Sequence, residues 1–534
     1  MASRLRFRNM FAGLALLSSG CTVGPDYKSP SLWSPSTWLG HNRQTVGNRE
    51  VLLASTVDAS PPDPSWWEVF HDPELSALER RAAQGNLDVR IATARLAESR
   101  AQLRETAGDL YPSLNGSGSY TREKISDKLV QRGLQSAGGG LAPLLGGSGN
   151  AANLQSYAGN ASIPPLDLWK DGIDASWELD LWGRVRREVE SARANLTASV
   201  EDRRSVLIAR LAEVARDYMM LRGSQALLAI ALENQKTAEG SLKLTQARYA
   251  GGLTTDLDVQ NAASQLDTIS ADIPNEQQQV AQQINALSLL LGEPPQGLRD
   301  ELETAQPVPP IPPLVPIGVP SELARRRPDI REAEAKLHAA TASVGVAVAD
   351  FYPRVTLTGA LNFESLQYRD LAFWPAAAYT FGPSISLPIF QGGKLRGQLQ
   401  LSKAQQQEAA INYQKTVLSA WHDVDNALTA YAAEQRRHDQ LARSVQAGQR
   451  ALQLAQEQYR GGLETFLNVL DAQRSLLSAQ QQLANSTATQ SGNLVQLYTA
   501  LGGGWETTFP TDQDRAHLAD AQRADERRAA TGGA

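Results

Sequence analysis

The sequence is poor in the residues on which enzymes and metal sites most often depend. Its single cysteine, Cys21, cannot form a disulfide within the chain, and none of its six histidines has the spacing of a metal site. His422 and Asp423 are adjacent, and adjacent residues on a helix do not face each other, so they cannot act as a catalytic pair. No nucleophile motif built on serine, cysteine or lysine is present. The sequence therefore predicts neither an enzyme nor a bound metal.

Basic charge and aromatic side chains are also scarce. The formal net charge is −6 over 534 residues, and no basic stripe indicates a nucleic-acid partner. Aromatic residues make up 6% of the chain, which is low for a packed globular core of this size. That composition is typical of long helices that meet through small side chains.

The first 20 residues have the pattern of a secretory signal peptide. Three arginines precede an apolar run at 10–17, which is too short to span a bilayer, and small residues follow at 18–20. A cysteine directly after small residues resembles a bacterial lipoprotein cleavage site, so we predict a covalent lipid on Cys21 and no other cofactor. Ser18 stands where leucine is usual, and the alternative is an ordinary signal peptide followed by an unmodified cysteine.

Two long helical patterns are copies of each other. Residues 184–249 contain no proline and only two glycines, and they predict one helix of 66 residues, roughly 100 Å long at ~1.5 Å per residue. The copy at 394–459 follows 210 residues later. Gly-Gly-Leu follows each helix, at 251–253 and 461–463, and predicts a tight turn into a returning helix. The chain is therefore an internal duplication.

Shorter helices are expected beside the long ones. The returning helices are predicted at 255–291 and 465–501, each closed by Leu-Gly. A helix should begin at Asp72-Pro73 and continue to about Leu110, and another should cover about 322–350. The first returning helix and the helix at 322–350 together match the length of one long helix, so we expect them to lie end to end beside it.

Four stretches outside the helices have a period of two. Apolar and polar residues alternate in the ranges 113–120, 173–180, 355–363 and 379–389. One apolar face on strands of about ten residues fits transmembrane barrel strands, with Trp177 and Phe381 toward lipid. Two half-buried hairpins in a soluble sheet are the alternative. Four strands cannot close a barrel, because barrels begin at about eight strands, so the pattern predicts an oligomer.

The repeats set the boundaries of the chain's parts. The first hairpin carries 31 more residues than the second, most of them in a Gly-rich stretch at 136–160 that we predict to be a flexible external loop. The predicted order is signal peptide 1–20, extended N-terminal segment 21–71, first repeat 72–292 with hairpin 113–181 and turn 250–254, Pro-rich linker 293–321, second repeat 322–502 with hairpin 354–389 and turn 460–464, and a disordered tail 503–534.

Together these motifs resemble the TolC-like outer-membrane efflux factors, and most of all their lipidated branch that serves resistance-nodulation-division pumps. The resemblance covers the chain after the signal peptide except its tail. It rests on the sequence around Cys21 (21–27), Trp66-Trp67, the run at 70–73, the Tyr-Pro before each hairpin, the run at 180–184 and the two Gly-Gly-Leu turns.

The resemblance implies a mainly α protein with a transmembrane β part. The family fold is a homotrimer whose 12-stranded β-barrel, four strands per chain, lies in the outer membrane and continues into a long α-helical coiled-coil barrel, with a mixed equatorial region. The implied function is the outer-membrane channel of a tripartite efflux pump. Its implied partners are a periplasmic adaptor protein and, through it, an inner-membrane pump. An exit duct for type I protein secretion, or a structural coiled-coil lipoprotein without a channel, are the alternatives.

The resemblance also implies a periplasmic gate just inside the turns. Ring-forming carboxylates repeated three times in a trimer would hold cations and repel anions. An apolar residue one helical turn away from a carboxylate would add an apolar ring beside it. Asp256 also fits a plain helix-dipole role, whereas Asp471 lies too far inside its helix for that. The residues that match the gate are Asp256, Asp258, Leu467, Asn468 and Asp471.

The turns themselves are implied to dock the adaptor protein. Turn chemistry alone explains their glycines, whereas an exposed leucine in both copies indicates a partner. The candidate docking residues are Gly251, Gly252, Leu253, Gly461, Gly462 and Leu463.

Overall fold

A computed structural model describes residues 22–30, 35, 38, 45–46, 49–50, 55–124, 165–371 and 373–509. The predicted signal peptide, Cys21, the Gly-rich loop at 136–160 and the tail after 509 lie outside these residues. The chain divides into two compact units. The sheet unit consists of the chain up to Asp26 with 102–192 and 341–404, and the helical unit consists of 27–101, 193–340 and 405–534.

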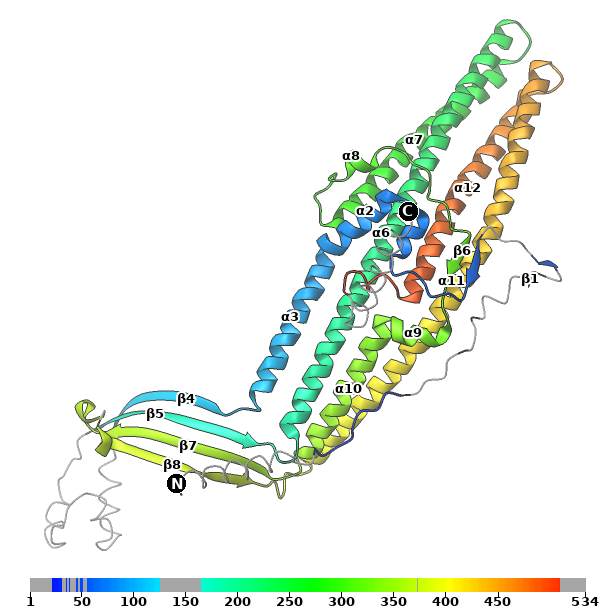
Figure 1. Ribbon diagram of the computed structural model, residues 1–534. Helices are drawn as coiled ribbons and strands as arrows, with labels where there is room; N and C mark the ends of the chain where they lie inside the picture. Colours follow the sequence, from blue (N-terminus) through cyan, green and yellow to red (C-terminus); the bar gives the residue numbers. More distant parts are fainter. Residues whose placement is uncertain are drawn as a thin grey trace, which may run out of the picture. The chain divides into compact units, whose positions relative to one another are not determined.

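The sheet unit contains one antiparallel sheet of four strands in the order β4-β5-β7-β8 (Figure 1). The second strand, β5, begins seven residues before the alternating pattern predicted, because residues 166–176 pair with the whole length of β4. The strands are β4 Ser113–Glu123, β5 Leu166–Leu179, β7 Arg354–Ser365 and β8 Ala377–Ser386, with short 3-10 helices η4 Tyr368–Asp370 and η5 Trp374–Ala376 between the last two.

The register places the predicted apolar residues on one face of this sheet. Directly opposed residues share a face, and the opposed pairs include Trp177 with Leu357, and Gly359 with Phe381. The other face carries opposed polar pairs, among them Asn115 with Asp174, Ser176 with Thr358, Thr356 with Ser384, and Lys170 with Glu364. The sheet is therefore amphipathic across all four strands.

Trp177 occupies a more polar position on that face than the alternation predicted. Its indole Nε1 donates a hydrogen bond to the carbonyl oxygen of Leu110 at 3.0 Å, just before β4 begins. Phe381 lies in the middle of β8, and its ring covers Gly359, where an added Cβ would lie 3.4 Å from the ring. Phe381 therefore marks the apolar middle of the sheet better than Trp177 does.

Four helices carry the duplication into the helical unit. The two long helices, α6 Arg184–Ala250 and α11 Lys394–Arg460, have 67 residues each. The returning helices, α7 Asp256–Leu291 and α12 Phe466–Leu501, have 36 residues each. None of the helices in the described parts of the chain has the length and apolar composition that crossing a bilayer requires.

The helix predicted to run unbroken from Asp72-Pro73 to about Leu110 is interrupted. The structure has α2 Pro73–Gly85 and α3 Leu87–Gly108, and Asn86 between them has ψ of 129°. The Asn86 Oδ1 accepts hydrogen bonds from the backbone N–H groups of Asp88 and Val89, so it caps α3. Its Nδ2 donates to the carbonyl oxygen of Leu290 at 2.7 Å, which attaches the break to α7.

The prediction of a single helix at 322–350 is also wrong. Two helices are present, α9 Pro320–Arg326 and α10 Pro328–Ala349, and Arg327 between them is extended with ψ of 120°. A residue before proline avoids the helical conformation because it clashes with the proline ring. Since α10 has only 22 residues, it and α7 together are shorter than one long helix.

Parts of the N-terminal segment and the linker have regular structure that the sequence did not predict. Strand β3 Thr56–Asp58 pairs in parallel with β6 Leu314–Pro316 of the linker. The linker also contains α8 Arg299–Leu302. A two-residue pair, β1 Thr45–Val46 and β2 Arg49–Glu50, precedes them.

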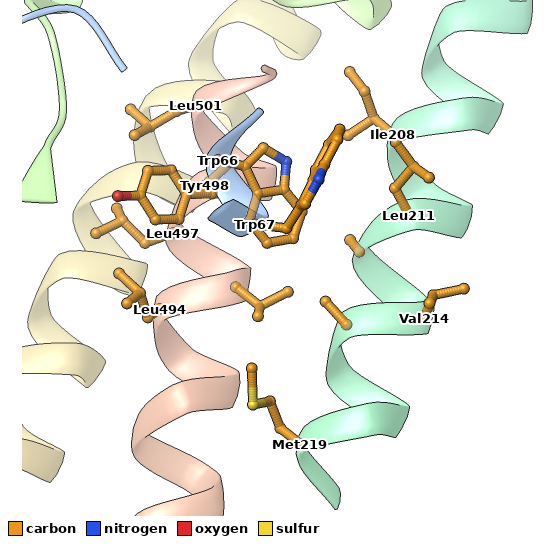
Figure 2. Close-up of a cluster of buried hydrophobic side chains, with 14 of the residues drawn as sticks. Trp66, Trp67, Ile208, Leu211, Val214, Met219, Leu494, Leu497, Tyr498 and Leu501 are labelled. Atoms are coloured by element: carbon orange, nitrogen blue, oxygen red, sulfur yellow. The ribbon is translucent and has the colours of Figure 1, made fainter. Parts of the chain in front are cut away.

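The main core of the helical unit forms around two tryptophans. The 3-10 helix η2 Trp66–Phe70 inserts Trp66 and Trp67 between α6 and α12 (Figure 2). Trp66 stacks on Tyr498 with ring centroids 5.6 Å apart and is fully buried. Burying an aromatic side chain stabilises the fold by about 1.5–3 kcal/mol. This segment therefore helps to hold α6 of the first helical hairpin against α12 of the second.

Residues 503–509, which we expected to be the start of a disordered tail, are packed against the helical unit. The Trp505 ring is buried and lies under the guanidinium of Arg204 at 4.2 Å. Arg204 Nη2 also donates to the carbonyl oxygen of Phe509 at 3.0 Å. The aromatic residues Trp505 and Phe509 supply the contacts that pack this part of the chain, since each ring lies against an arginine of α6.

Candidate functional site

The two turns have the same backbone geometry. The N–H of Leu253 donates to the carbonyl oxygen of Arg248, and the N–H of Gly252 donates to that of Tyr249, both at 2.9 Å. The equivalent bonds, 210 residues later, close the second turn. This is the Schellman arrangement, and it requires a left-handed residue, which is Gly252 (φ 70°) in one turn and Gly462 (φ 73°) in the other. Of the candidate docking residues, only these two glycines are required by the turn itself.

Both candidate docking leucines point away from the helices. Leu253 is 69% exposed and Leu463 is 80% exposed. Figure 1 shows the two turns at the same end of the helical unit. A pair of exposed apolar side chains on adjacent turns is a surface suited to a protein partner.

The candidate gate residues of the first copy lie in the first turn of α7. Thr255 is the residue before the helix, but its side chain makes no capping bond. The Thr254 hydroxyl instead donates to the carboxylate of Asp258, and Gln260 Nε2 lies 3.4 Å from Asp256 Oδ1. Both carboxylates lie near the positive end of the helix dipole, as the simpler interpretation of Asp256 requires.

The candidate residues of the second copy lie along one side of α12. Asn468 Nδ2 donates to the carboxylate of Glu464, which repeats the Thr254–Asp258 contact with donor and acceptor exchanged. Leu467 is exposed, and Asp471 lies one turn further along and is also exposed. Within the described part of the chain, no ion-pair partner of Asp471 is found.

A fourth exposed leucine near the turns was missed from the sequence. Leu257 is 67% exposed, and it is the 210-residue equivalent of Leu467, which is 64% exposed. The repeat offset would have identified it. The same offset pairs Asp258 with Asn468 and Asn261 with Asp471, so each copy carries one acid in these two positions.

Arg248 connects the first turn to the second. Its Nη1 donates to the backbone carbonyl oxygens of Tyr459 at 2.9 Å and Arg460 at 3.1 Å, at the end of α11. Its guanidinium lies 4.7 Å from the centroid of the Tyr459 ring. Cations near a helix C-terminus and over an aromatic face are both favourable. Sequence reasoning did not select Arg248, because nothing local marks a contact across 211 residues.

The end of the helical unit that carries the turns presents exposed apolar and acidic side chains. Among the residues that the structure describes, no cluster of three or more histidine, cysteine or acidic side chains could hold a metal ion. The turns are closed by glycine, and the side chains exposed on them and beside them are leucines and carboxylates. Exposed apolar side chains of this kind suit a surface that a protein partner contacts.

An amphipathic four-stranded sheet combined with duplicated helical hairpins of this length defines a channel-forming outer-membrane protein. The chain belongs to the outer membrane efflux protein family, whose model matches residues 78–293 and 319–503.

Its curated relatives include proteins named as components of efflux pumps and efflux systems. It is 33% identical over 492 residues to the probable efflux pump outer membrane protein TtgC of Pseudomonas putida strain KT2440, covering 92% of this chain and 94% of that protein. It is 31% identical over 499 residues to the cation efflux system protein CusC of Escherichia coli O157:H7, covering 92% and 98%.

Solved structures of such channels have the same fold. The outer-membrane channel OprN matches with a TM-score of 0.78 and 33% identity, covering 91% of this chain and 100% of that one. The open-state MtrE channel of Neisseria gonorrhoeae matches with a TM-score of 0.72 and 28% identity, covering 91% and 99%. The chain is therefore an outer-membrane channel component of an efflux pump, as the sequence predicted.

Proposed function

We propose that the protein works as a homotrimer that gives exported small molecules a passage from the periplasm to the exterior. The amphipathic sheet is the observation that carries this proposal. Its outer strands, β4 and β8, each pair on one side only within the described residues. Exposed strand edges favour further pairing, and three copies joined edge to edge would close a barrel of 12 strands.

The turns are the proposed docking surface for a periplasmic adaptor protein, which links the channel to an inner-membrane pump. Leu253 and Leu463 support this role because both are exposed on hydrogen-bonded turns that glycine closes. In a trimer they would form six similar apolar contacts around one end. Repeated weak contacts give high combined affinity when their geometry matches that of the partner.

The proposed gate lies immediately beside these turns. Asp256, Asp258 and Asp471 would supply carboxylates, Asn468 a neutral polar group, and Leu467 an apolar ring. Leu257 extends that apolar ring, since it has the same position in the other copy. In a trimer, each of these side chains would occur three times around a narrow opening.

The trimer is tested by isolating the outer-membrane fraction and comparing unheated with heated samples on a denaturing gel. We expect a band at about three times the chain mass that converts to monomer on heating. A protein that runs only as monomer would favour the alternative of a structural coiled-coil lipoprotein. Co-purification of an ATP-driven secretion exporter in place of a small-molecule pump would favour a type I secretion duct.

A covalent lipid on Cys21 is the second part of the proposal. The segment that follows Cys21 contacts the sheet unit. The N–H of Val23 donates to the carbonyl oxygen of Trp182 at 3.1 Å. Asp26 also pairs with Arg187 at 2.6 Å, so the segment is fastened beside the end of β5. A relative of 30% identity, SilC of Salmonella typhimurium, is named a probable outer membrane lipoprotein. A lipid here would lie close to the barrel.

We expect labelled palmitate to enter the wild-type protein and to be absent from Cys21→Ser. Acyl chains contribute about 0.8 kcal/mol per buried CH₂, so the lipid adds membrane affinity to that of the strands. The measurement is fluorography of the immunoprecipitated protein after metabolic labelling. Label in the Cys21→Ser protein would exclude this site of attachment.

A further inference from the structure

One face of α6 is covered by other segments of the helical unit. The Tyr218 hydroxyl donates to Asp72 Oδ2, at the start of α2, at 2.7 Å. Arg222 Nη1 donates to the carbonyl oxygen of Thr304 in the linker at 3.0 Å. Both α6 side chains are buried by these contacts.

The neighbouring helix α12 is covered on one face in the same way. Tyr498 stacks on Trp66 of η2, as Figure 2 shows. The Ser491 hydroxyl donates to the carbonyl oxygen of Pro309 in the linker at 3.3 Å, and it is buried. We call η2, α2 and linker residues 302–309 the cover of α6 and α12.

The opposite faces of the two helices are open. A residue two positions earlier on a helix lies ~200° further round the axis. Two positions before the covered residues of α6 are Arg216 and Met220, which are both exposed. Two positions before the covered residues of α12 are Thr489 and Gln496, which are also exposed.

A hollow of about 380 Å³ lies between the open faces of α6 and α12. At Gly223 the two helices touch, because an added Cβ would lie 2.8 Å from the Cβ of Ala488. At Gly492 they leave space, because an added Cβ would meet no atom within 4 Å. The volume is within the range of sites that bind small molecules, ~300–1,000 Å³.

The lining of this hollow combines apolar, amide and hydroxyl groups with one cation. Met220 and Leu227 supply its larger apolar side chains. Arg216 is the only charged side chain among the described residues that line it. The remaining polar side chains of the lining are Ser224, Asn485, Thr489, Asn493 and Gln496.

The Arg216 guanidinium is available to a ligand. Its Nη1 lies 3.5 Å from Gln496 Oε1 across the hollow, and it makes no ion pair among the residues that the structure describes. The carboxylate of Glu213, one turn earlier, pairs with Arg210. Asp217 is the next residue, so its side chain lies ~100° round the helix.

We propose that this hollow is a transient binding site for amphipathic organic anions on their way through the channel. The proposal rests on the homotrimeric channel and names a class of molecule that it retains. Three copies of the cover inside the ring of helices would fill the passage, so the cover lies outside and the open face lines the passage. The apolar body of the anion contacts Met220 and Leu227, and its charged group binds Arg216. Rings of arginine favour anions in pores.

Benzoate, benzamide and benzylammonium test this, because they join one apolar ring to an anionic, a neutral and a cationic group. We expect benzoate to interrupt the current of single wild-type channels in planar bilayers at lower concentrations than the other two. Arg216→Gln should raise the concentration of benzoate that gives half-block at least about fivefold, since a charge-assisted hydrogen bond typically contributes that much. Gly492→Leu should raise it by a similar factor, because the leucine side chain fills the hollow.

Two matched controls lie elsewhere on α6. Lys236→Gln removes an exposed cation, and Gly240→Leu adds a side chain at a helical glycine where an added Cβ would also meet no atom within 4 Å. Both should leave block by benzoate within about twofold of wild type. Leucine is a better helix former than glycine, so neither Gly492→Leu nor Gly240→Leu should weaken its helix.

Three results would overturn the inference: wild-type channels that benzoate does not interrupt, equal block by benzylammonium, or unchanged block in Gly492→Leu. The gel of unheated samples separates these results from a failure of the proposed function. If the wild-type protein forms neither a trimer nor a conducting channel, the proposed function fails. If it forms both and the expected pattern of block is absent, only the inference about the hollow fails.

Discussion

Replacing Phe381 by aspartate should prevent the protein from reaching its heat-sensitive form in the outer membrane. Phe381 lies in the middle of β8 on the apolar face, opposite Gly359. A basic residue at the bilayer midplane of a barrel costs ~2–4 kcal/mol, and aspartate costs somewhat less. The cost is repeated in each subunit of a trimer. The measurement is the fraction of protein in the outer membrane that resists unfolding before heating.

Ser384→Asp is the control for this substitution. Ser384 lies three residues further along the same strand on the polar face, opposite Thr356. An added carboxylate there would face water, so the amount of heat-sensitive protein should stay close to that of wild type. Equal tolerance of both substitutions would mean that the apolar face of the sheet does not contact lipid.

The second large effect is expected at the gate. Replacing Asp471 by alanine should reduce the preference of the open channel for cations over anions and weaken block by divalent cations added on the side of the turns. Three carboxylates close together repel one another, and bound cations or protons offset that repulsion. Reversal potentials in asymmetric salt measure the preference, and titration with Mg²⁺ measures the block.

Two controls isolate the role of the carboxylate. Glu233→Ala removes the same charge from an exposed position on α6, and it should leave both quantities unchanged. Leu467→Ser changes the neighbouring turn of α12 and should raise the leak without altering ion preference, because it removes apolar surface and no charge. If Asp471→Ala retains wild-type selectivity, the acidic constriction lies elsewhere and these aspartates serve only their helices.

The repeated elements could be predicted from the sequence because their signals are local and occur twice. Each long helix is a run of helix-forming residues, and each turn is written as Gly-Gly-Leu. The strands follow from alternation, although β5 begins seven residues earlier than its alternation does. Its first residues are fixed by pairing with β4, which no local pattern reveals.

The interruptions were missed for different reasons. Asn86 is a polar residue inside a good helical pattern, and its break depends on the carbonyl of Leu290, which is distant in sequence. The break before Pro328 had a local signal, which is the proline itself. It was overlooked because the residues on both sides have a helical pattern. The parallel pairing of β3 with β6 joins two three-residue strands that lie far apart in the sequence.

At the candidate site, the sequence predicted which residues are exposed better than it predicted which residues contact each other. The exposure of Leu253, Leu463 and Leu467 agrees with their proposed roles. Leu257 was missed although the repeat offset points to it. Arg248 could not have been found, because its partners are backbone carbonyl groups, and backbone groups carry no sequence signal.

The equal lengths of the paired helices restrict how this chain can vary in size. Both long helices have 67 residues and both returning helices have 36. One inserted residue would rotate everything after it by ~100° and move it by ~1.5 Å along the axis. An insertion in α6 before Arg248 would move the Arg248 side chain away from Tyr459 and would point Leu253 in a different direction. We therefore expect single-residue insertions and deletions to be tolerated poorly within these helices and better in the segment between β4 and β5, where the first copy is already the longer.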